Sequence, residues 1–358
     1  LIKNIAPKSS GFIKRGEAAI LIYNALNASV MEADSFGSNG DIYKIEKDKT
    51  FLSEKLKIMK SRGQVTATDM SSLVDASSTV RKGEVQIDRN VFKIGNTNAN
   101  DYFGYHVVFY YKENNDLSEN TLVFIAAQKG RNEVVTVNAS NIDEGTTKEK
   151  FVYYLDQEKK ENKKELKISL TADLIKPVSG KVILIDTDLN NEYDIIFVTE
   201  YHTLVVERIS LLDDKIYDRY KQFNHNQPLD AEVNSDNEIV IEKNGSGIDI
   251  SEIKPWDVLS VTKSLSSAGG KPFIKINVIN NSITGIVEEI TNDDKFVING
   301  KEYEKSKYYI EAVISKNADP VTIGNECEIL LDIEGKVAAV KDYNQFNFAY
   351  LKAVSGKK

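Results

Sequence analysis

One run of side chains has the residue types and the spacing of a calcium site. Asp186, Asp188, Asn190, Glu192 and Asp194 carry oxygen atoms at alternate positions. Calcium takes about six to eight oxygen ligands, and an acidic loop with this spacing can supply several of them. The run lacks the central glycine and the final glutamate of an EF-hand loop. A polar hairpin turn between two apolar strands explains the same residues by turn propensity, so the sequence leaves both interpretations open.

The residue types of nucleophilic or metal-dependent catalysis do not form a recognisable pattern. His106, His202 and His225 lie at unrelated places in the chain, and Cys327 alternates with two glutamates as a core residue of a strand would. The sequence has no Gly-x-Ser-x-Gly, His-Glu-x-x-His, phosphate-loop or dinucleotide-binding motif. We therefore predict that the protein is not an enzyme and that calcium is its one candidate cofactor.

These residues lie in a repeated pattern of strands. Four segments each run strand, polar turn, strand, short link, strand: residues 83–112, 150–187, 238–263 and 294–332. One strand of each copy opens at an anchor residue, and the anchors are Gly104, Gly180, Trp256 and Gly324. A further apolar strand precedes each copy, which gives about five short strands per copy, enough for a small barrel or sandwich.

The fold class predicted from this repeat is mainly β, with small barrel or sandwich modules in a row and a short N-terminal helical segment. The sequence does not distinguish a barrel from a sandwich. We place modules 1 to 4 at residues 63–132, 133–202, 203–282 and 283–343. Residues 344–358 would be the leading strand of a further module, so we expect the natural protein to continue past Lys358.

The region ahead of module 1 has two predicted parts. Residues 1–29 contain apolar side chains at helical spacing over residues 9–26. Within residues 30–62, residues 31–50 read as a linker rich in Gly, Ser, Asp and Lys, and residues 51–60 read as a short amphipathic helix that Gly63 ends.

Composition argues against a nucleic-acid partner, a membrane-spanning helix and an internal disulfide. The net charge is -8 and no basic stripe is present, so a nucleic-acid partner is not expected. No apolar run reaches the roughly 18 to 20 residues that a membrane-spanning helix needs. The single cysteine, Cys327, excludes an internal disulfide.

The N-terminal helix carries a family resemblance. Residues 13–19 (IKRGEAA) resemble the end of a surface-layer homology (SLH) repeat, whose signature is Ile-Thr-Arg-Ala-Glu followed by a helix of small residues. Arg15 and Glu17 fall on the signature Arg and Glu, whereas Lys14 and Gly16 depart from it. The family builds its wall-polymer groove from three such repeats, and most of that groove would lie upstream of residue 1. The resemblance implies that Arg15 and Glu17 belong to a site for secondary cell-wall polysaccharide.

The body of the chain, roughly residues 60 to 345, also resembles the β modules that follow such repeats in surface proteins of Gram-positive bacteria, with motifs at residues 182–188, 253–261 and 331–340. This resemblance implies an exported, wall-associated protein and no activity. The expected function is a non-catalytic structural component of a bacterial S-layer or surface filament, located at the cell surface. Its expected partners are copies of itself and the wall polymer.

Two further features bear on this expectation. Phe346, Phe348 and Tyr350 lie in a strand-like segment with nothing after it to pair with, so we predict an interface there. The adjacent pairs Tyr153–Tyr154 and Tyr308–Tyr309 would each place one ring outward if they lie in strands. Outward tyrosines would suit an array of carbohydrate-binding modules. Two alternatives to the structural function therefore stay open. The chain could be an array of carbohydrate-binding modules, or a spacer within a larger exported enzyme.

Overall fold

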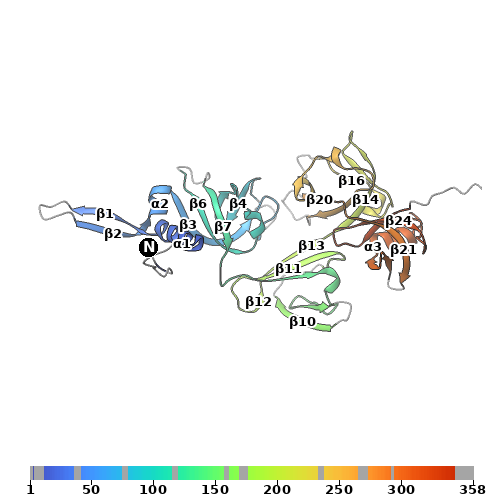
Figure 1. Cartoon of the computed structure of the whole chain (residues 1–358), viewed down its shortest axis with the longest axis horizontal. Coiled ribbons are helices and arrows are strands. Elements are labelled where there is room, and N and C mark those ends of the chain that lie inside the picture. The colour runs from blue at the N-terminus through green and yellow to red at the C-terminus, as the bar shows by residue number, and fades with distance from the viewer. Residues whose placement is uncertain are drawn as a thin grey trace, which may run out of the picture.

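The computed structural model describes residues 3, 12–35, 42–74, 80–114, 120–156, 161–168, 176–232, 238–264, 273–291 and 294–342. Within these ranges the protein is mainly β and has several separate sheets, a small closed barrel and an N-terminal helix, which confirms the predicted fold class. Figure 1 shows the sheets following one another along the long axis, with a two-stranded hairpin projecting at one end.

The N-terminal region contains α1 (Arg15–Leu26), β1 (Ser29–Ser35), β2 (Ile42–Thr50) and α2 (Phe51–Leu56). The predicted linker over residues 31–50 was therefore wrong for its described residues, because β1 and β2 pair as an antiparallel hairpin. The Gly, Ser, Asn and Asp residues that suggested a linker are concentrated at 36–41, outside the described ranges. The segments on either side alternate apolar and polar residues, as strands do, but the composition of the whole region hid this pattern.

The predicted helix after this hairpin is shorter than expected. It ends at Leu56, and Lys57 closes it in the left-handed conformation with a φ of 54°. Strand β3 (Ile58–Ala67) follows at once, so Gly63 lies inside a strand and does not end a helix. A Cβ at Gly63 would lie 2.4 Å from a carboxylate oxygen of Asp88, so glycine is needed there for close approach of the next hairpin.

Module 1 is a closed five-stranded barrel in the order β3-β4-β5-β7-β6. Its remaining elements are β4 (Glu84–Ile87), β5 (Asn90–Lys93), the 3₁₀ helix η2 (Ala99–Tyr102), β6 (His106–Lys112) and β7 (Thr121–Ala127). The buried core of the barrel includes Val65, Phe92, Phe109 and Leu122.

Module 4 has the same strand order, β23-β22-β21-β24-β25. Its elements are β21 (Ser282–Thr291), β22 (Lys295–Ile298), β23 (Lys301–Glu304), α3 (Lys307–Ile314), β24 (Glu326–Leu331) and β25 (Val337–Asp342). A parallel bridge joins Lys305 to Val337, just as Lys93 pairs with Thr121 where the barrel of module 1 closes. The helix α3 takes the place of η2.

Modules 2 and 3 also have a leading strand, an anchor strand and a last strand side by side, but their other strands are arranged differently. Module 2 consists of β8 (Glu133–Asn138), η4 (Ala139–Asn141), β9 (Lys150–Asp156), β10 (Glu161–Ile168), β11 (Gly180–Asp186), β12 (Glu192–Tyr193) and β13 (Ile195–Glu200), in two three-stranded sheets. Module 3 consists of β14 (His202–Ser210), β15 (Lys215–Asp218), η5 (Phe223–Asn226), β16 (Leu229–Asp230), β17 (Glu238–Lys243), β18 (Ser246–Gly247), η6 (Ile250–Glu252), β19 (Val258–Lys263) and β20 (Phe273–Ile279), in one seven-stranded sheet.

All four modules share a core of three strands, in which the anchor strand lies between the leading strand and the last strand. These triplets are β3-β6-β7, β8-β11-β13, β14-β19-β20 and β21-β24-β25. The four anchors named from the sequence all have a positive φ, between 76° and 109°. Glycine tolerates this conformation, which explains its use at three of the four anchors.

A shared bulge fixes the anchor in modules 1, 3 and 4. The amide of the anchor donates to the carbonyl of a buried leading-strand valine, at 2.9 Å from Gly104 to Val65 and 2.8 Å from Trp256 to Val206. The corresponding bond from Gly324 to Val287 is 2.8 Å. The register of the leading strand shifts immediately after each of these valines.

Candidate functional site

The acidic run at residues 186–194 forms a tight turn after β11. Asp186 is fully buried, and its two carboxylate oxygens accept backbone N–H groups, from Leu189 at 2.7 Å and Asn191 at 2.8 Å. Leu189 and Asn191 both adopt a positive φ, as such a turn requires. The carboxylate of Asp186 thus bonds the backbone of its own loop.

The other oxygens of the run have separate partners. Asp194 accepts from the Thr187 hydroxyl at 2.6 Å, and the Asn190 side chain accepts from the Glu192 amide at 2.7 Å. Glu192 forms an ion pair with Lys167. In the part of the chain that the structure describes, no three His, Cys, Asp or Glu side chains gather as a metal site. The geometry accounts for the run as a turn, and calcium binding at Asp188 and its neighbours stays a prediction.

Two more buried aspartates organise turns in modules 3 and 4. Asp218 accepts from the amides of Gln222 at 2.7 Å and Phe223 at 2.8 Å. Asp332 accepts from the amides of Glu334 and Lys336, both at 2.9 Å and both on Oδ1. Burial raises the pKa of Asp332 to about 6. Both of these hydrogen bonds fall on one oxygen of Asp332, whereas Asp186 and Asp218 each accept with both carboxylate oxygens.

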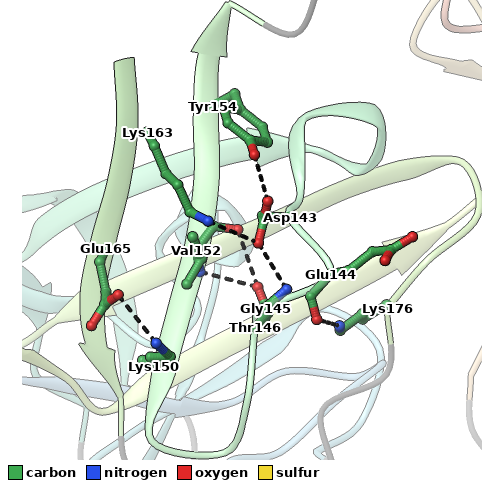
Figure 2. Close-up of polar contacts among 10 residues, drawn as sticks. All are labelled: Asp143, Glu144, Gly145, Thr146, Lys150, Val152, Tyr154, Lys163, Glu165 and Lys176. Carbon is green, nitrogen blue, oxygen red and sulfur yellow. Dashed lines mark hydrogen bonds and ion pairs between the residues drawn. The ribbon is translucent and has the colours of Figure 1, made fainter. Parts of the chain in front are cut away.

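A fourth aspartate, Asp143, is the centre of the polar network in Figure 2. Its carboxylate accepts from the Tyr154 hydroxyl at 2.6 Å, the Gly145 amide at 2.8 Å and the Lys163 ammonium at 3.3 Å. The hydrogen bond from Tyr154, followed by those from Gly145 and Lys163, lowers the pKa of Asp143 to about 2.

The Asp143 network joins the loop before β9 to strands β9 and β10. Next to it, Thr146 bridges the backbone of Val152, accepting from its amide at 3.0 Å and donating to its carbonyl at 3.1 Å. A carboxylate this well satisfied favours a structural role over proton transfer. Asp143 is a site residue that the predicted motifs did not include, although an Asp two residues before a Gly is a turn signal.

Modules 3 and 4 share one apolar core. Val205, Tyr220 and Val258 of module 3 belong to the same buried cluster as Phe296 and Tyr309 of module 4. The Tyr308 hydroxyl of α3 crosses this junction. It donates to Asp218 and accepts from the Val205 amide at 3.1 Å. Burial, followed by the nearby Asp218 carboxylate, raises the pKa of Tyr308 well above its usual value.

Modules 1 and 2 meet through a smaller contact. The rings of Phe103 and Phe197 stack with centroids 4.9 Å apart. The Phe197 ring also lies against the anchor Gly104, where an added Cβ would come within 2.9 Å of it. Arg131 donates to the Thr187 carbonyl at 3.4 Å. The cores of modules 1 and 2 are separate clusters.

A cleft of about 570 Å³ lies where modules 2, 3 and 4 meet. It brings together His202 and His225, which the sequence placed at unrelated positions. Asn224, His225 and Asn226 have consecutive φ values of 46°, 53° and 67°, an unusual left-handed stretch for residues other than glycine. The amide of the anchor Gly180 donates to Glu334 at 2.7 Å and links module 2 to module 4. Sequence spacing alone could not reveal this meeting of three modules.

The predicted wall-polymer residues lie at the start of α1. Arg15 is exposed, and the carboxylate of Glu17 accepts from the Lys14 amide at 2.9 Å, which caps the helix. No residue of α1 is buried. Phe346, Phe348 and Tyr350, the predicted interface residues, lie outside the described residues.

No known protein family matches this chain, and no curated protein matches it. The resemblance to SLH repeats therefore has no support from these comparisons. Across the described ranges, no helix is long and apolar enough to cross a membrane.

Proposed function

We propose that the chain is a non-catalytic structural component of a bacterial surface layer or filament, and that it assembles with copies of itself through an open strand edge. The observation that carries this proposal is the projecting hairpin β1–β2 (Figure 1). A two-stranded sheet is at best marginally stable by itself in water. Addition of further strands would stabilise it.

One face of this hairpin is apolar and exposed. Met31 pairs with Ile45, and Ala33 pairs with Tyr43, so these four side chains lie on the same face. Met31, Tyr43 and Ile45 are 59%, 55% and 56% exposed. An exposed apolar patch of this kind marks an interaction surface.

The charges favour pairing of β2 with the β2 strand of a second copy. If two β2 strands run antiparallel and are centred on Ile45, Lys44 lies opposite the partner's Glu46, and Glu46 lies opposite the partner's Lys44. The two Ile45 side chains then meet on the apolar face. The other edge is less suitable, because β1 carries Glu32 and Asp34 and would place like charges together in a centred pair.

The test is a charge swap on β2, followed by analytical ultracentrifugation of the full chain. The parent should form dimers or larger assemblies. Lys44→Glu should shift them toward monomer, because each pairing would then place two glutamates together. The double variant Lys44→Glu, Glu46→Lys should restore assembly. A monomeric parent would refute self-assembly, and a parent that assembles equally well with Lys44→Glu would refute this edge as the route.

The location and the second partner rest on the SLH resemblance. We propose that the N-terminal region attaches the protein to secondary cell-wall polysaccharide, with Arg15 contributing a cationic contact and Glu17 holding the start of α1. Arg15→Ala should weaken sedimentation of the protein with purified cell walls. Unchanged sedimentation would remove Arg15 from this role.

A further inference from the structure

A second cavity, of about 580 Å³, lies between modules 3 and 4 and is distinct from the three-module cleft. Its walls include Arg219, Tyr220 and Trp256 from module 3, and Tyr309 and Lys341 from module 4. Small-molecule sites usually measure about 300 to 1,000 Å³ and combine aromatic walls with a few polar groups. This cavity has the size and the lining of such a site.

Two donors at this cavity are buried and unpaired. Tyr309 is only 2% exposed, and its hydroxyl has no hydrogen-bond partner among the described residues. The Nε–H group of Arg219 is likewise buried without a partner in those ranges. Buried polar groups in folded proteins are nearly always paired. Both donors belong to side chains that line one cavity, which points to an acceptor that a ligand supplies once the donors are uncovered.

The tryptophan at this cavity has an unusual backbone and a cationic environment. Trp256 is the one anchor that is not glycine, and its φ of 76° is strained for an aromatic residue. The Arg219 guanidinium lies 3.7 Å from its ring centroid, and the Lys341 ammonium lies 5.5 Å away. The Lys341 ammonium already pairs with Glu328 at 3.1 Å, so the Arg219 guanidinium is the group that favours an anionic acceptor.

The lining of this cavity also includes carboxylates that can accept hydrogen bonds from the hydroxyl groups of a ligand. Glu207 and Asp319 are exposed side chains at the cavity and present carboxylate oxygens that accept O–H donors. They would repel a densely charged acidic chain but tolerate a ligand with a single carboxylate per unit.

We propose that this cavity binds a carboxylate-bearing saccharide of the uronic acid class. Its carboxylate accepts from Tyr309 and Arg219, and its hydroxyls donate to Glu207 and Asp319. Both donors are covered in the free protein, so binding includes a local rearrangement of the cavity floor. This inference is independent of self-assembly and of the N-terminal region.

The test uses the full chain and the fluorescence of Trp256, the only tryptophan. Titration with trigalacturonic acid should give a saturable change in emission, whereas maltotriose and sodium acetate should give none. No saturable change with trigalacturonic acid would overturn the proposal. Equal binding of maltotriose would overturn the requirement for a carboxylate, and equal binding of acetate would overturn the saccharide class.

The variant Tyr309→Phe separates binding from folding. It removes a hydroxyl that lacks a partner, so the melting temperature should stay the same or rise. Affinity for trigalacturonic acid, measured by calorimetry, should fall about tenfold, as expected for the loss of one hydrogen bond to a charged group. Unchanged affinity would overturn the role of this hydroxyl and with it the site.

Two further variants provide controls. Tyr193→Phe in module 2 removes a hydroxyl that donates to Glu133 at 3.1 Å, far along the chain from the cavity. It should lower stability and leave affinity unchanged. Arg219→Lys keeps the charge but loses the Nε–H group, and it should weaken binding. Full affinity in Arg219→Lys would count against the proposal even if Tyr309→Phe failed to fold.

Discussion

Modules 3 and 4 meet across a continuous apolar core, whereas modules 1 and 2 meet through a small contact centred on one stacked pair of rings. At the first junction, Tyr308 from α3 enters module 3 and bonds both Asp218 and the Val205 amide. At the second, Phe103 and Phe197 stack between two separate cores. The same three-stranded core is therefore joined in two ways.

The difference shows that modules with similar sequences and strand orders need not be equally coupled to their neighbours during unfolding. Small modules bury limited apolar surface, and neighbours that share a core gain stability from each other. Modules 3 and 4 should unfold as one unit. Module 1, whose barrel is closed and has its own core, should unfold separately. Trp256 reports on the first unit because it packs against the shared core.

Tyr308→Ala should have the largest effect. It deletes a buried ring from the shared core and two hydrogen bonds across the junction, so the transition of modules 3 and 4 should lose about 3 to 5 kcal/mol. The measurement is urea unfolding followed by Trp256 fluorescence. Tyr110→Ala is the matched control, because that ring packs against Phe124 in module 1. A small loss in Tyr308→Ala, or an equal loss in the control, would contradict the shared core.

Asp332→Asn should have an intermediate effect that depends on pH. The folded pKa of Asp332 is about 6, above its ordinary 3.8, so the folded state holds this proton more tightly than the unfolded state. Its contribution to stability is full below about pH 4 and is lost as the pH rises to 6. Above that, ionisation inside the protein costs on the order of 3 kcal/mol.

Asparagine keeps the Oδ1 acceptor of both loop amides and cannot ionise. The variant should therefore be more stable than the parent above pH 6 and equally stable near pH 4. Urea unfolding at several pH values between 4 and 7.5 measures this difference. The same difference at every pH would show that Asp332 is not the titrating group.

Phe197→Ala should have the smallest effect. It removes one half-buried ring from the junction of modules 1 and 2, which we expect to cost about 1 to 2 kcal/mol in module 2. Hydrogen exchange followed by mass spectrometry should show faster exchange in β11 and β13, with no change in the Trp256 transition. A shift of the Trp256 transition to lower urea, or a loss as large as that of Tyr308→Ala, would remove the contrast between the two junctions.

The sequence allowed prediction of the features that depend on local backbone chemistry. The anchors Gly104, Gly180 and Gly324 are positive-φ positions where glycine is the natural choice. Asn299 and Gly300 have φ values of 53° and 70°, as their hairpin-turn signal predicts. The mainly β fold follows from these repeated signals.

Features that depend on packing between distant segments were not predictable. Tyr308 and Tyr309 were expected in a strand, with one ring outward, but both are buried on α3. Ser306 begins this helix by accepting from the Tyr309 amide at 3.2 Å, a cap that the β-rich context obscured. The unpaired hydroxyl of Tyr309, and the cleft that both His202 and His225 line, exist only after the modules have packed.

The three-stranded core also has a mechanical consequence. In every module the leading strand and the last strand run in the same direction on either side of the anchor strand, antiparallel to it. Tension on the chain pulls these outer strands in opposite directions along their length. The hydrogen bonds of both ladders then share the load in shear and do not open one at a time as in unzipping. A protein built from such units would resist stretching in a way that its modest size alone does not suggest.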